Sequence, residues 1–341
     1  MPRISTTVVG SYPVPQWLLA SPSEQALVDA TRVVIGIQEH AGIDVVCDGE
    51  LYRFDLNHPE TNGMIEYFVR PLDGVSQRFS FDALVAWRAD SGMKFRTRPP
   101  GVVVGPLGHG ALDLPLACAR AKALARKPFK FTLTGPHMLA KTLIDRHYGD
   151  TAELAHALAD VLAGQVAQLD ADVVQVDEAN LPGHADEWQW AASAINRVLD
   201  AVPGKPAVHL CFGNYGGQTV QKGTWKRLID YLNALHADHV VLECAHRPPA
   251  ELEAFRELDP RIGLGLGVVD IKVNEVESAE AVARAIERAE GIVGAGRVRY
   301  VHPDCGFWML PRSVADAKMR ALTAGRDLFE GISRSDSRPA H

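Results

Sequence analysis

The sequence has no excess of positive charge and no long apolar run. Its 35 Lys and Arg residues are outnumbered by 42 Asp and Glu residues, which gives a formal net charge of −7. We therefore expect no nucleic-acid partner, because such a chain offers no basic surface to neutralise a phosphate backbone. No stretch approaches the roughly 20 apolar residues that span a bilayer. The first residues, MPRISTTVVGSYPVP, resemble neither a signal peptide nor a transit sequence. These absences favour a cytoplasmic protein that acts on a small molecule, with no membrane association.

Cysteine is also scarce. The five cysteines lie at positions 47, 118, 211, 244 and 305. An odd, scattered set in a chain without an export signal argues against a disulfide framework. Metal ligation, or burial as small apolar side chains, remains open for each cysteine. With 47% hydrophobic and 23% charged residues, the 341-residue chain can bury a large core, which excludes disordered and fibrous classes.

Short runs rich in Val, Ile, Leu and Phe recur along the chain, as is typical of strands buried on both faces. Amphipathic stretches lie between them. Eight such alternations predict an α/β protein, a (β/α)8 TIM barrel, in preference to an open doubly wound sheet. The predicted strands are 7–10, 44–47, 130–134, 172–177, 207–212, 239–243, 262–268 and 298–302. The predicted helices are 24–40, 151–169, 187–201, 224–237, 279–290 and 312–330.

One region departs from this alternation. Residues 52–126, between the second and third strands, are too long and irregular for one crossover helix, and we expect an inserted hairpin there with FRTRPPGVVVGPL as one arm. No linker or repeat divides the chain. We therefore predict a single domain over residues 1–333 and a flexible tail over 334–341.

Four potential metal ligands follow the predicted strands. His209 and Cys211 alternate along one strand and so point to the same face, Glu243 ends the next strand, and Cys305 follows the last. The strand C-terminal ends of such a barrel form its active site. One imidazole, one carboxylate and two thiolates make a set suited to zinc, and a zinc rich in thiolates suits thiol activation. His302 and Asp304, which flank Cys305, are candidates for orienting these ligands. Each cysteine could instead be an ordinary buried residue, and we assign Cys47, Cys118 and Cys244 to packing.

The segments TTVVGSYPVP, DVVCDGE, FTLTGP, QVDE and HPDCG, together with the His-x-Cys strand, occur in an order that resembles the catalytic C-terminal barrel of cobalamin-independent methionine synthases. The resemblance covers nearly the whole chain. It implies zinc on the same four residues and a homocysteine pocket, in which Gly10 and Ser11 contact the carboxylate end of the amino acid. Glu50 and Asp177 would hold its ammonium, although both could be ordinary charged rim residues.

The chain departs from that family at three points. It lacks the second, N-terminal barrel of the long enzymes and so resembles their short relatives. Lys272 stands where the family has a proton-donating His, and a Lys could donate that proton only with a depressed pKa; it could equally be a solvated loop residue. The Trp that flanks folate has no clear counterpart in the 137–142 segment HMLAKT. Arg96 stands where the family places an Arg near the folate tail, or it is a solvated Arg of the hairpin.

We therefore expect a zinc-dependent methyltransferase that converts L-homocysteine to methionine. Its methyl donor would be methylcobalamin or a corrinoid protein, which needs no proton to leave, or methyltetrahydrofolate. Two alternatives remain at this point. One is a related zinc alkyltransferase that acts on another thiol such as coenzyme M, although a sulfonate would be poorly matched to Glu50 and Asp177. The other is a protein that only binds zinc or a thiol metabolite.

Overall fold

The computed structural model describes residues 3–55, 63–90, 98–214 and 219–332. Within these ranges, eight parallel strands form one sheet in the order β1-β11-β10-β9-β8-β7-β5-β2. A parallel bridge between Thr7 and Val45 joins the two edge strands and closes the sheet into a ring. The predicted α/β barrel is confirmed. Its strands are β1 Ser5–Thr6, β2 Val46–Cys47, β5 Phe129–Thr134, β7 Val173–Asp177, β8 Lys205–Leu210, β9 His239–Leu242, β10 Gly263–Val269 and β11 Val298–Pro303.

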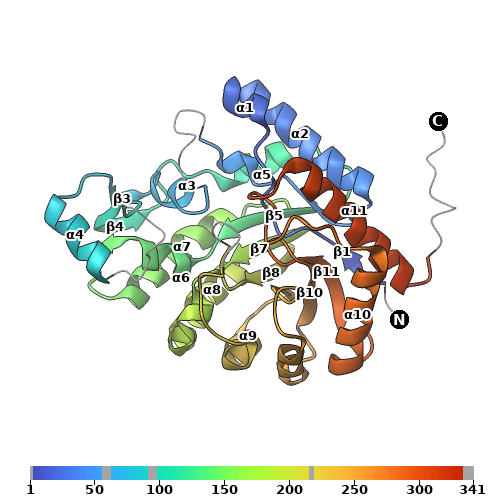
Figure 1. The fold of residues 1–341 in the computed structure, drawn as a ribbon. Coiled ribbons are helices and arrows are strands. Elements are labelled where there is room, and N and C mark those ends of the chain that lie inside the picture. Colours follow the sequence, from blue (N-terminus) through green and yellow to red (C-terminus); the bar gives the residue numbers. More distant parts are fainter. Residues whose placement is uncertain (1–2, 56–62, 91–97, 215–218, 333–341) are drawn as a thin grey trace.

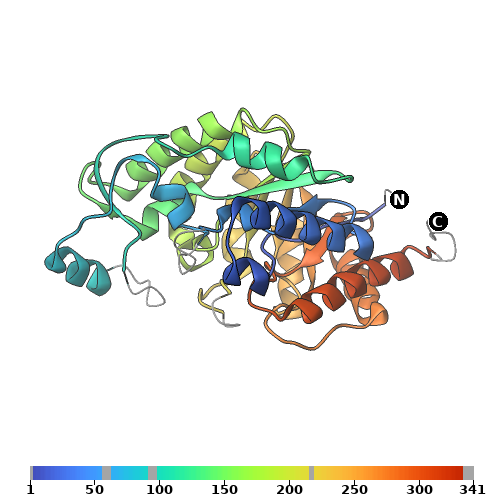
Figure 2. The same cartoon turned by 90° about the horizontal axis from the view of Figure 1, so that it is seen from above.

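Helices cover the outside of this ring (Figures 1 and 2). Their ends carry the expected caps: the Ser23 hydroxyl accepts the backbone N–H of Ala26 at the start of α2, and Gly42 adopts a positive φ of 88° after its end. The helices are α1 Gln16–Ala20, α2 Glu24–Ala41, α5 Leu114–Lys122, α6 Pro136–Thr142, α7 Thr151–Val166, α8 Trp188–Leu199, α9 Ile229–Ala234, α10 Ala279–Val293 and α11 Arg312–Phe329. None of the helices in the described ranges is both long and apolar enough to cross a lipid bilayer.

Two crossovers differ from the predicted helices. The expected helix 224–237 is divided into a 3-10 turn, η4 Trp225–Leu228, and the short α9. Between β9 and β10 the chain forms a 3-10 helix, η5 Pro249–Glu257, which the sequence pattern did not predict. Pro248 and Pro249 stand at its N-cap and first position, where a missing backbone N–H costs nothing. Shorter 3-10 turns occur at η1 Leu51–Arg53, η2 Leu181–Gly183 and η3 Ala185–Glu187.

The insertion after β2 stands beside the barrel, at the left of Figure 1. Strand β3 Asp73–Ser76 pairs antiparallel with β4 Val102–Gly108, so the predicted hairpin arm is present from Val102 onward. Helices α3 Glu66–Val69 and α4 Phe81–Asp90 lie in the same region. The short strand β6 Ile144–Asp145, which follows α6, pairs with β4 and ties the insertion to the barrel.

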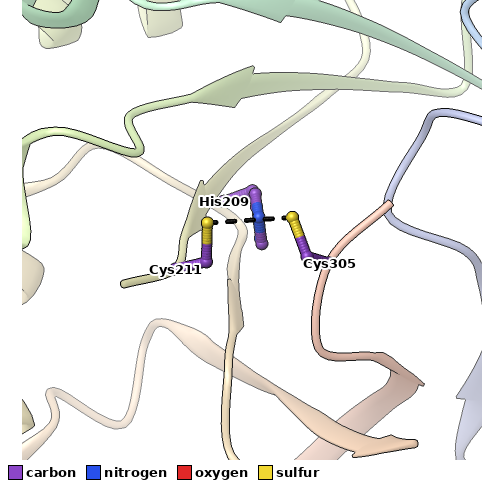
Figure 3. Close-up of side chains that lie close together, drawn as sticks. All are labelled: His209, Cys211 and Cys305. Carbon is purple, nitrogen blue, oxygen red and sulfur yellow. Dashed lines mark hydrogen bonds between the residues drawn. The ribbon is translucent and has the colours of Figure 1, made fainter. Parts of the chain in front are cut away.

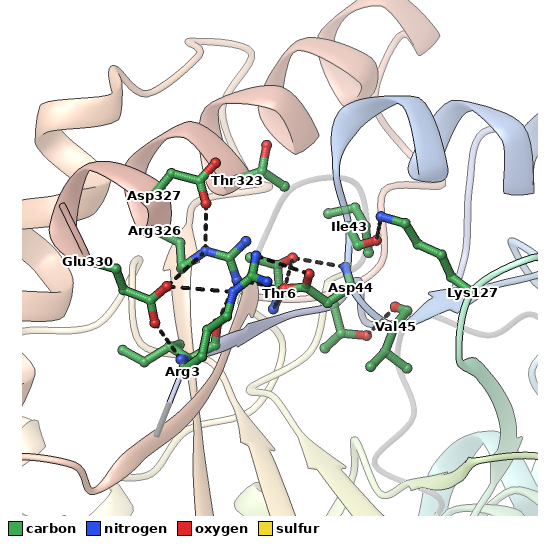
Figure 4. Close-up of polar contacts among 12 residues, drawn as sticks. Arg3, Thr6, Ile43, Asp44, Val45, Lys127, Thr323, Arg326, Asp327 and Glu330 are labelled. Atoms are coloured by element: carbon green, nitrogen blue, oxygen red, sulfur yellow. Dashed lines mark hydrogen bonds and ion pairs between the residues drawn. The ribbon is translucent and has the colours of Figure 1, made fainter. Parts of the chain in front are cut away.

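The two ends of the described chain meet at the N-terminal end of the barrel, where α2 and α11 lie side by side (Figures 2 and 4). The buried Arg326 guanidinium of α11 donates to the Asp44 carboxylate at 2.6 Å and to the Ile4 carbonyl at 2.6 Å. Asp44 also accepts the backbone N–H of Thr6 at 2.9 Å. These contacts join α11 to both β1 and the segment that leads into β2, so they hold the ring at its point of closure.

Candidate active site

The C-terminal ends of β8 and β11 bring together three side chains that could bind a metal. His209 lies in β8, Cys211 follows it directly, and Cys305 follows β11. One ligand atom from each lies within 4.8 Å of the others (Figure 3). This is the grouping that the alternation along β8 predicts, because residues two apart on a strand face the same side.

The imidazole of His209 is oriented for a ligand. Its Nδ1 lies 2.8 Å from the carbonyl oxygen of Val241, and since a carbonyl can only accept, Nδ1 carries the proton. The other nitrogen, Nε2, is buried and has no hydrogen-bond partner among the described residues. A buried acceptor without a partner is costly unless a cation binds it. The orphaned Nε2 is therefore the ligand atom that a metal would use.

The two sulfurs fit the same ion. The Sγ atoms of Cys211 and Cys305 lie 3.8 Å apart. Two sulfurs at 2.3 Å from a tetrahedral zinc are separated by about 3.8 Å, so their spacing matches one edge of such a site. A hydrogen bond from Cys305 holds the pKa of the Cys211 thiol well below its usual range, against the effect of burial. The site thus stabilises a thiolate, the form of cysteine that binds metals.

Glu243 does not join this cluster. It follows β9 and is fully buried, and both of its oxygens are already engaged. Oε1 lies 2.9 Å from Nζ of Lys272, and Oε2 accepts the backbone N–H of Phe212 at 3.0 Å. Burial, followed by the negative charge of Cys211, raises the pKa of Glu243. Of the four predicted ligands, the structure brings three together and places the fourth beside them in an ion pair.

The residues predicted to bind the amino acid lie next to the cluster. Ser11 packs against the loop of Cys305: the N–H of Phe307 donates to the Ser11 carbonyl at 2.8 Å, and a Cβ on Gly306 would lie 1.9 Å from the Ser11 hydroxyl oxygen. Gly10 is equally close to Glu50, because a Cβ at Gly10 would lie 2.0 Å from Glu50 Oε1. Gly10 and Gly306 therefore allow Glu50 and Ser11, respectively, to approach the backbone more closely than any residue with a Cβ would permit.

Glu50 is held in an unusual conformation. Its φ of 60° makes it the one non-glycine residue with positive φ in the described ranges, a conformation that costs about 1–3 kcal/mol. Its carboxylate pairs with the buried guanidinium of Arg53 at 3.2 Å and accepts the Thr132 hydroxyl at 2.9 Å. Such a strained conformation persists only where neighbouring contacts stabilise it, and the contacts with Arg53 and Thr132 do so here. They also fix the position of the Glu50 carboxylate.

Asp177 and Glu50 together form a carboxylate wall beside the cluster. Asp177 ends β7 and pairs in register with His209 of β8, so it adjoins the metal-binding residues. Gln175 donates to its carboxylate at 2.8 Å and in turn accepts from the buried ammonium of Lys130 at 2.7 Å. Burial, followed by the negative charge of Glu50, raises the pKa of Asp177 to about 6. The carboxylates of Asp177 and Glu50, which are 2% and 9% exposed, thus lie close together, and each would be stabilised by a further cation.

Residues 4–325 match the family model described as the cobalamin-independent synthase catalytic domain, which is nearly the whole chain. The chain belongs to the cobalamin-independent methionine synthase family. It is a methyltransferase, as are the relatives it resembles. A methionine synthase of Thermococcus kodakarensis is 30% identical, with 96% of this chain and 94% of the relative covered. A methionine synthase of Sulfurisphaera tokodaii is 28% identical, with coverage of 95% and 92%.

Solved structures agree with this family membership. A B12-independent methionine synthase from Shewanella, in complex with selenomethionine, matches with a TM-score of 0.77 and 25% identity, covering 96% of this chain and 98% of that one. A Listeria monocytogenes structure matches with a TM-score of 0.68 at 17% identity, over 96% and 99% of the two chains, and bears on the fold alone. The near-complete coverage of these chains agrees with the similarity to short relatives of the methionine synthases.

Lys272, predicted as a candidate proton donor, is the ion-pair partner of Glu243. Burial lowers its pKa, but the charge of Glu243 and the hydrogen bond to it outweigh burial and raise that pKa. The depressed pKa that proton donation requires is therefore not met in this arrangement, because Lys272 is the counter-ion of a buried carboxylate. It is also not a solvated loop residue, since its side chain is 2% exposed. Arg96, the predicted folate-side residue, lies outside the described residues.

Two further groups support the site. Asp304 is fully buried and accepts the backbone N–H groups of Cys244, Ala245 and His246 at 2.8, 2.8 and 2.7 Å, so it joins the loop after β9 to the loop that carries Cys305. The sequence singled out Asp304 for such an orienting role. The sequence analysis did not identify Arg53 as part of the site. Its position three residues after Glu50, in a loop that follows a barrel strand, was the signal that could have indicated this pairing.

Proposed function

We propose that the protein transfers a methyl group to the thiol of L-homocysteine, forming methionine, with zinc held by His209, Cys211 and Cys305 and, until the thiol arrives, by Glu243. The observation that carries this proposal is the convergence of one orphaned imidazole nitrogen and two sulfurs at tetrahedral spacing, beside the carboxylates of Glu50 and Asp177. The thiol would then take the fourth position of the zinc, the position that catalytic zinc sites leave to substrate.

The carboxylate wall supports an α-amino acid as substrate. Arg53 is the cation that pairs with Glu50, and Asp177 has Gln175 as its hydrogen-bond donor within the network described above. An ammonium group brought to these two carboxylates would supply the missing charge and form charge-assisted hydrogen bonds. The backbone at Gly10 and Ser11 would face the carboxylate end. A sulfonate substrate would instead be repelled by the wall, which argues against a coenzyme M-like acceptor.

The selenomethionine bound to the Shewanella relative supports the same assignment, because it is an analogue of the methionine product. Zinc would act as a Lewis acid that favours the thiolate form of the substrate sulfur. Asp177 and Glu50 would fix the amino-acid end, so that the sulfur is presented in one orientation. The sulfur then forms a bond to the methyl carbon as the bond to the donor breaks, and the bonding pair leaves with the donor.

For the donor, we propose a methyl-corrinoid, either methylcobalamin or a corrinoid protein. Transfer from methyltetrahydrofolate requires protonation of the leaving nitrogen, and Lys272, the residue in the position of the family's proton donor, is committed to Glu243. The folate-flanking Trp of the long enzymes has no clear counterpart in residues 137–142; His137 there stacks on Trp190, with ring centroids 4.9 Å apart, and its Nε2 lies 2.8 Å from Glu187. Cobalt leaves without a proton, so the arrangement suits a corrinoid.

The experiment is a donor panel with the purified, zinc-loaded protein. Methionine formation from homocysteine is measured with methylcobalamin and with methyltetrahydrofolate in separate reactions, and coenzyme M replaces homocysteine as the control acceptor. We expect methionine from homocysteine with methylcobalamin, and no methylated coenzyme M when coenzyme M replaces homocysteine. Activity with methyltetrahydrofolate alone would overturn the donor assignment, and a protein that binds no zinc would overturn the metal site.

A further inference from the structure

A buried lysine spans the inside of the barrel. Lys130 belongs to β5 and is 1% exposed. Its ammonium donates to Gln175 Oε1 of β7 at 2.7 Å and to the carbonyl of Val8, which follows β1. Strands β1 and β7 are not neighbours in the sheet, so the side chain joins them across the interior of the ring. Burying a cation is costly, and these acceptors are what compensates it here.

Gln175 extends this contact to the carboxylate wall. Its side chain is fully buried, and Nε2 donates to Asp177 Oδ1 at 2.8 Å and to the Val9 carbonyl at 2.9 Å. A carbonyl and an ionised carboxylate only accept hydrogen bonds, so the amide nitrogen must face them and the amide oxygen must face Lys130. Gln175 therefore has one orientation in which each of its hydrogen bonds is made, and the ammonium of Lys130 selects it.

The Lys130–Gln175 pair contacts both sides of the proposed amino-acid site. Asp177, on one side, is proposed to bind the ammonium of the substrate. The two carbonyls on the other side belong to the residues directly before Gly10 and Ser11, whose backbone is proposed to face the substrate carboxylate. In an α-amino acid these two charged groups are attached to the same carbon. Binding both at once therefore requires a fixed separation between the two sides of the site.

We propose that Lys130 and Gln175 fix the separation between Asp177 and the backbone after β1, and that they thereby make the acceptor site selective for an α-amino acid. This inference rests on the proposed homocysteine site and deepens it. Lys130 and Gln175 are positioning residues, since Asp177 and the backbone make the contacts with the substrate.

The other carboxylate of the wall is held independently. Glu50 pairs with Arg53 at 3.2 Å and accepts the Thr132 hydroxyl at 2.9 Å, and neither contact involves Lys130 or Gln175. A change at Lys130 therefore leaves one carboxylate partner in place for an ammonium group. The expected effect is a loss of discrimination among ligands, with weak binding retained.

The test measures Kd by calorimetry for the product L-methionine and two analogues, with the full-length, zinc-loaded protein. The deaminated analogue is a methylthiobutanoate, and the decarboxylated analogue is a methylthiopropylamine. Wild type should bind each analogue about 50-fold or more weakly than methionine, because each leaves one side of the site without its partner. In K130M and in Q175M both ratios should fall below about tenfold, since methionine loses its matched contacts and the analogues never made both.

Q165M is the matched control. Gln165 is also a buried glutamine, and its Oε1 accepts the backbone N–H of Leu114 at the start of α5, at 2.9 Å. Q165M should keep the wild-type ratios. Turnover with homocysteine gives a second measurement: K130M and Q175M should raise KM by about tenfold or more and change kcat by less than about threefold. A merely structural role would lower kcat and leave the ligand ratios unchanged.

The outcomes separate this inference from the proposed function. A wild type that binds methionine no better than the analogues overturns the amino-acid site itself. A wild type that discriminates, with K130M and Q175M keeping its ratios, overturns this inference alone. Q175M retains the ammonium of Lys130 and its Val8 contact, so it carries the test if K130M does not fold. The fixed separation also predicts that the β-amino isomer of methionine binds wild type about tenfold or more weakly. Equal binding of that isomer overturns the inference without any variant.

Discussion

Removing the positive charge of Arg53 should destabilise the protein far more than removing a comparable surface arginine. Arg53 is 3% exposed, pairs with Glu50 at 3.2 Å and donates to the Thr132 hydroxyl at 2.8 Å. R53M keeps the apolar stem but leaves Glu50 buried without its cation. Breaking a buried ion pair in this way costs about 3–5 kcal/mol of unfolding free energy. Urea unfolding followed by circular dichroism at neutral pH measures this loss.

Arg197 provides the matched control. It also pairs with a carboxylate, Asp160, at 2.9 and 3.0 Å, but the two side chains are 45% and 65% exposed. R197M should therefore cost less than about 1 kcal/mol. The double variant E50Q/R53M removes both buried charges and should be about 2 kcal/mol more stable than the sum of the single losses predicts. Two results would refute this reasoning. One is that R53M lowers the unfolding free energy no more than R197M does, and the other is that the losses of E50Q and R53M are simply additive. Either would show that burial does not determine the contribution of the Glu50–Arg53 pair to stability.

Three further predictions concern the metal, the substrate and the closure of the ring. C305S should reduce bound zinc per chain to below about half of the wild-type value in metal analysis. C118S, which changes a buried cysteine outside the cluster, should keep full zinc loading. Equal zinc loading of the two variants would contradict the assignment of Cys305 as a ligand. D177N should raise the KM for homocysteine by about 100-fold with a smaller change in kcat. D160N, at an exposed site, should leave both constants unchanged. An unaltered KM in D177N would show that Asp177 does not bind the substrate. Burial raises the pKa of Asp44, but hydrogen bonds from Thr6 and Arg326 outweigh it and hold that pKa below its usual value near 4. The stability that Asp44 contributes is therefore present above pH 4 and lost as the pH falls through the depressed folded pKa. D44N should cost about 1.5–3 kcal/mol at pH 7, and its difference from wild type should shrink by pH 3; a difference that is constant with pH would refute this account.

The barrel could be predicted because its signal is local and repeated. Each strand is a short buried run, and strand ends mark the active face, so His209, Cys211 and Cys305 were identifiable from their places relative to those runs. The contacts that hold the ring closed were not visible in the pattern, because they join residues such as Arg326 and Asp44, which are 282 residues apart.

The surroundings of Glu243 show where sequence reasoning stops. The sequence places Glu243 at the end of β9, beside the cluster, but it does not show which groups the two oxygens of Glu243 contact. Here the partner is Lys272, 29 residues further along the chain, delivered by a loop whose own anchor lies in α11. Spacing along one strand predicts which face a side chain takes, whereas the partner of a buried charge is decided by several distant segments together.

The closure of the ring also sets an order of events during synthesis. Strand β1 is among the first segments made, yet its partner β11 comes almost 300 residues later. At 5–20 residues per second a ribosome takes about 15–60 seconds to cover that interval. Cys305 follows β11, so a nascent chain acquires its third sulfur or nitrogen donor only when the last strand emerges. The proposed site can therefore hold a metal with all three side chains only after the last strand has been made, and a chain truncated before this point would expose both barrel edges and lack Cys305.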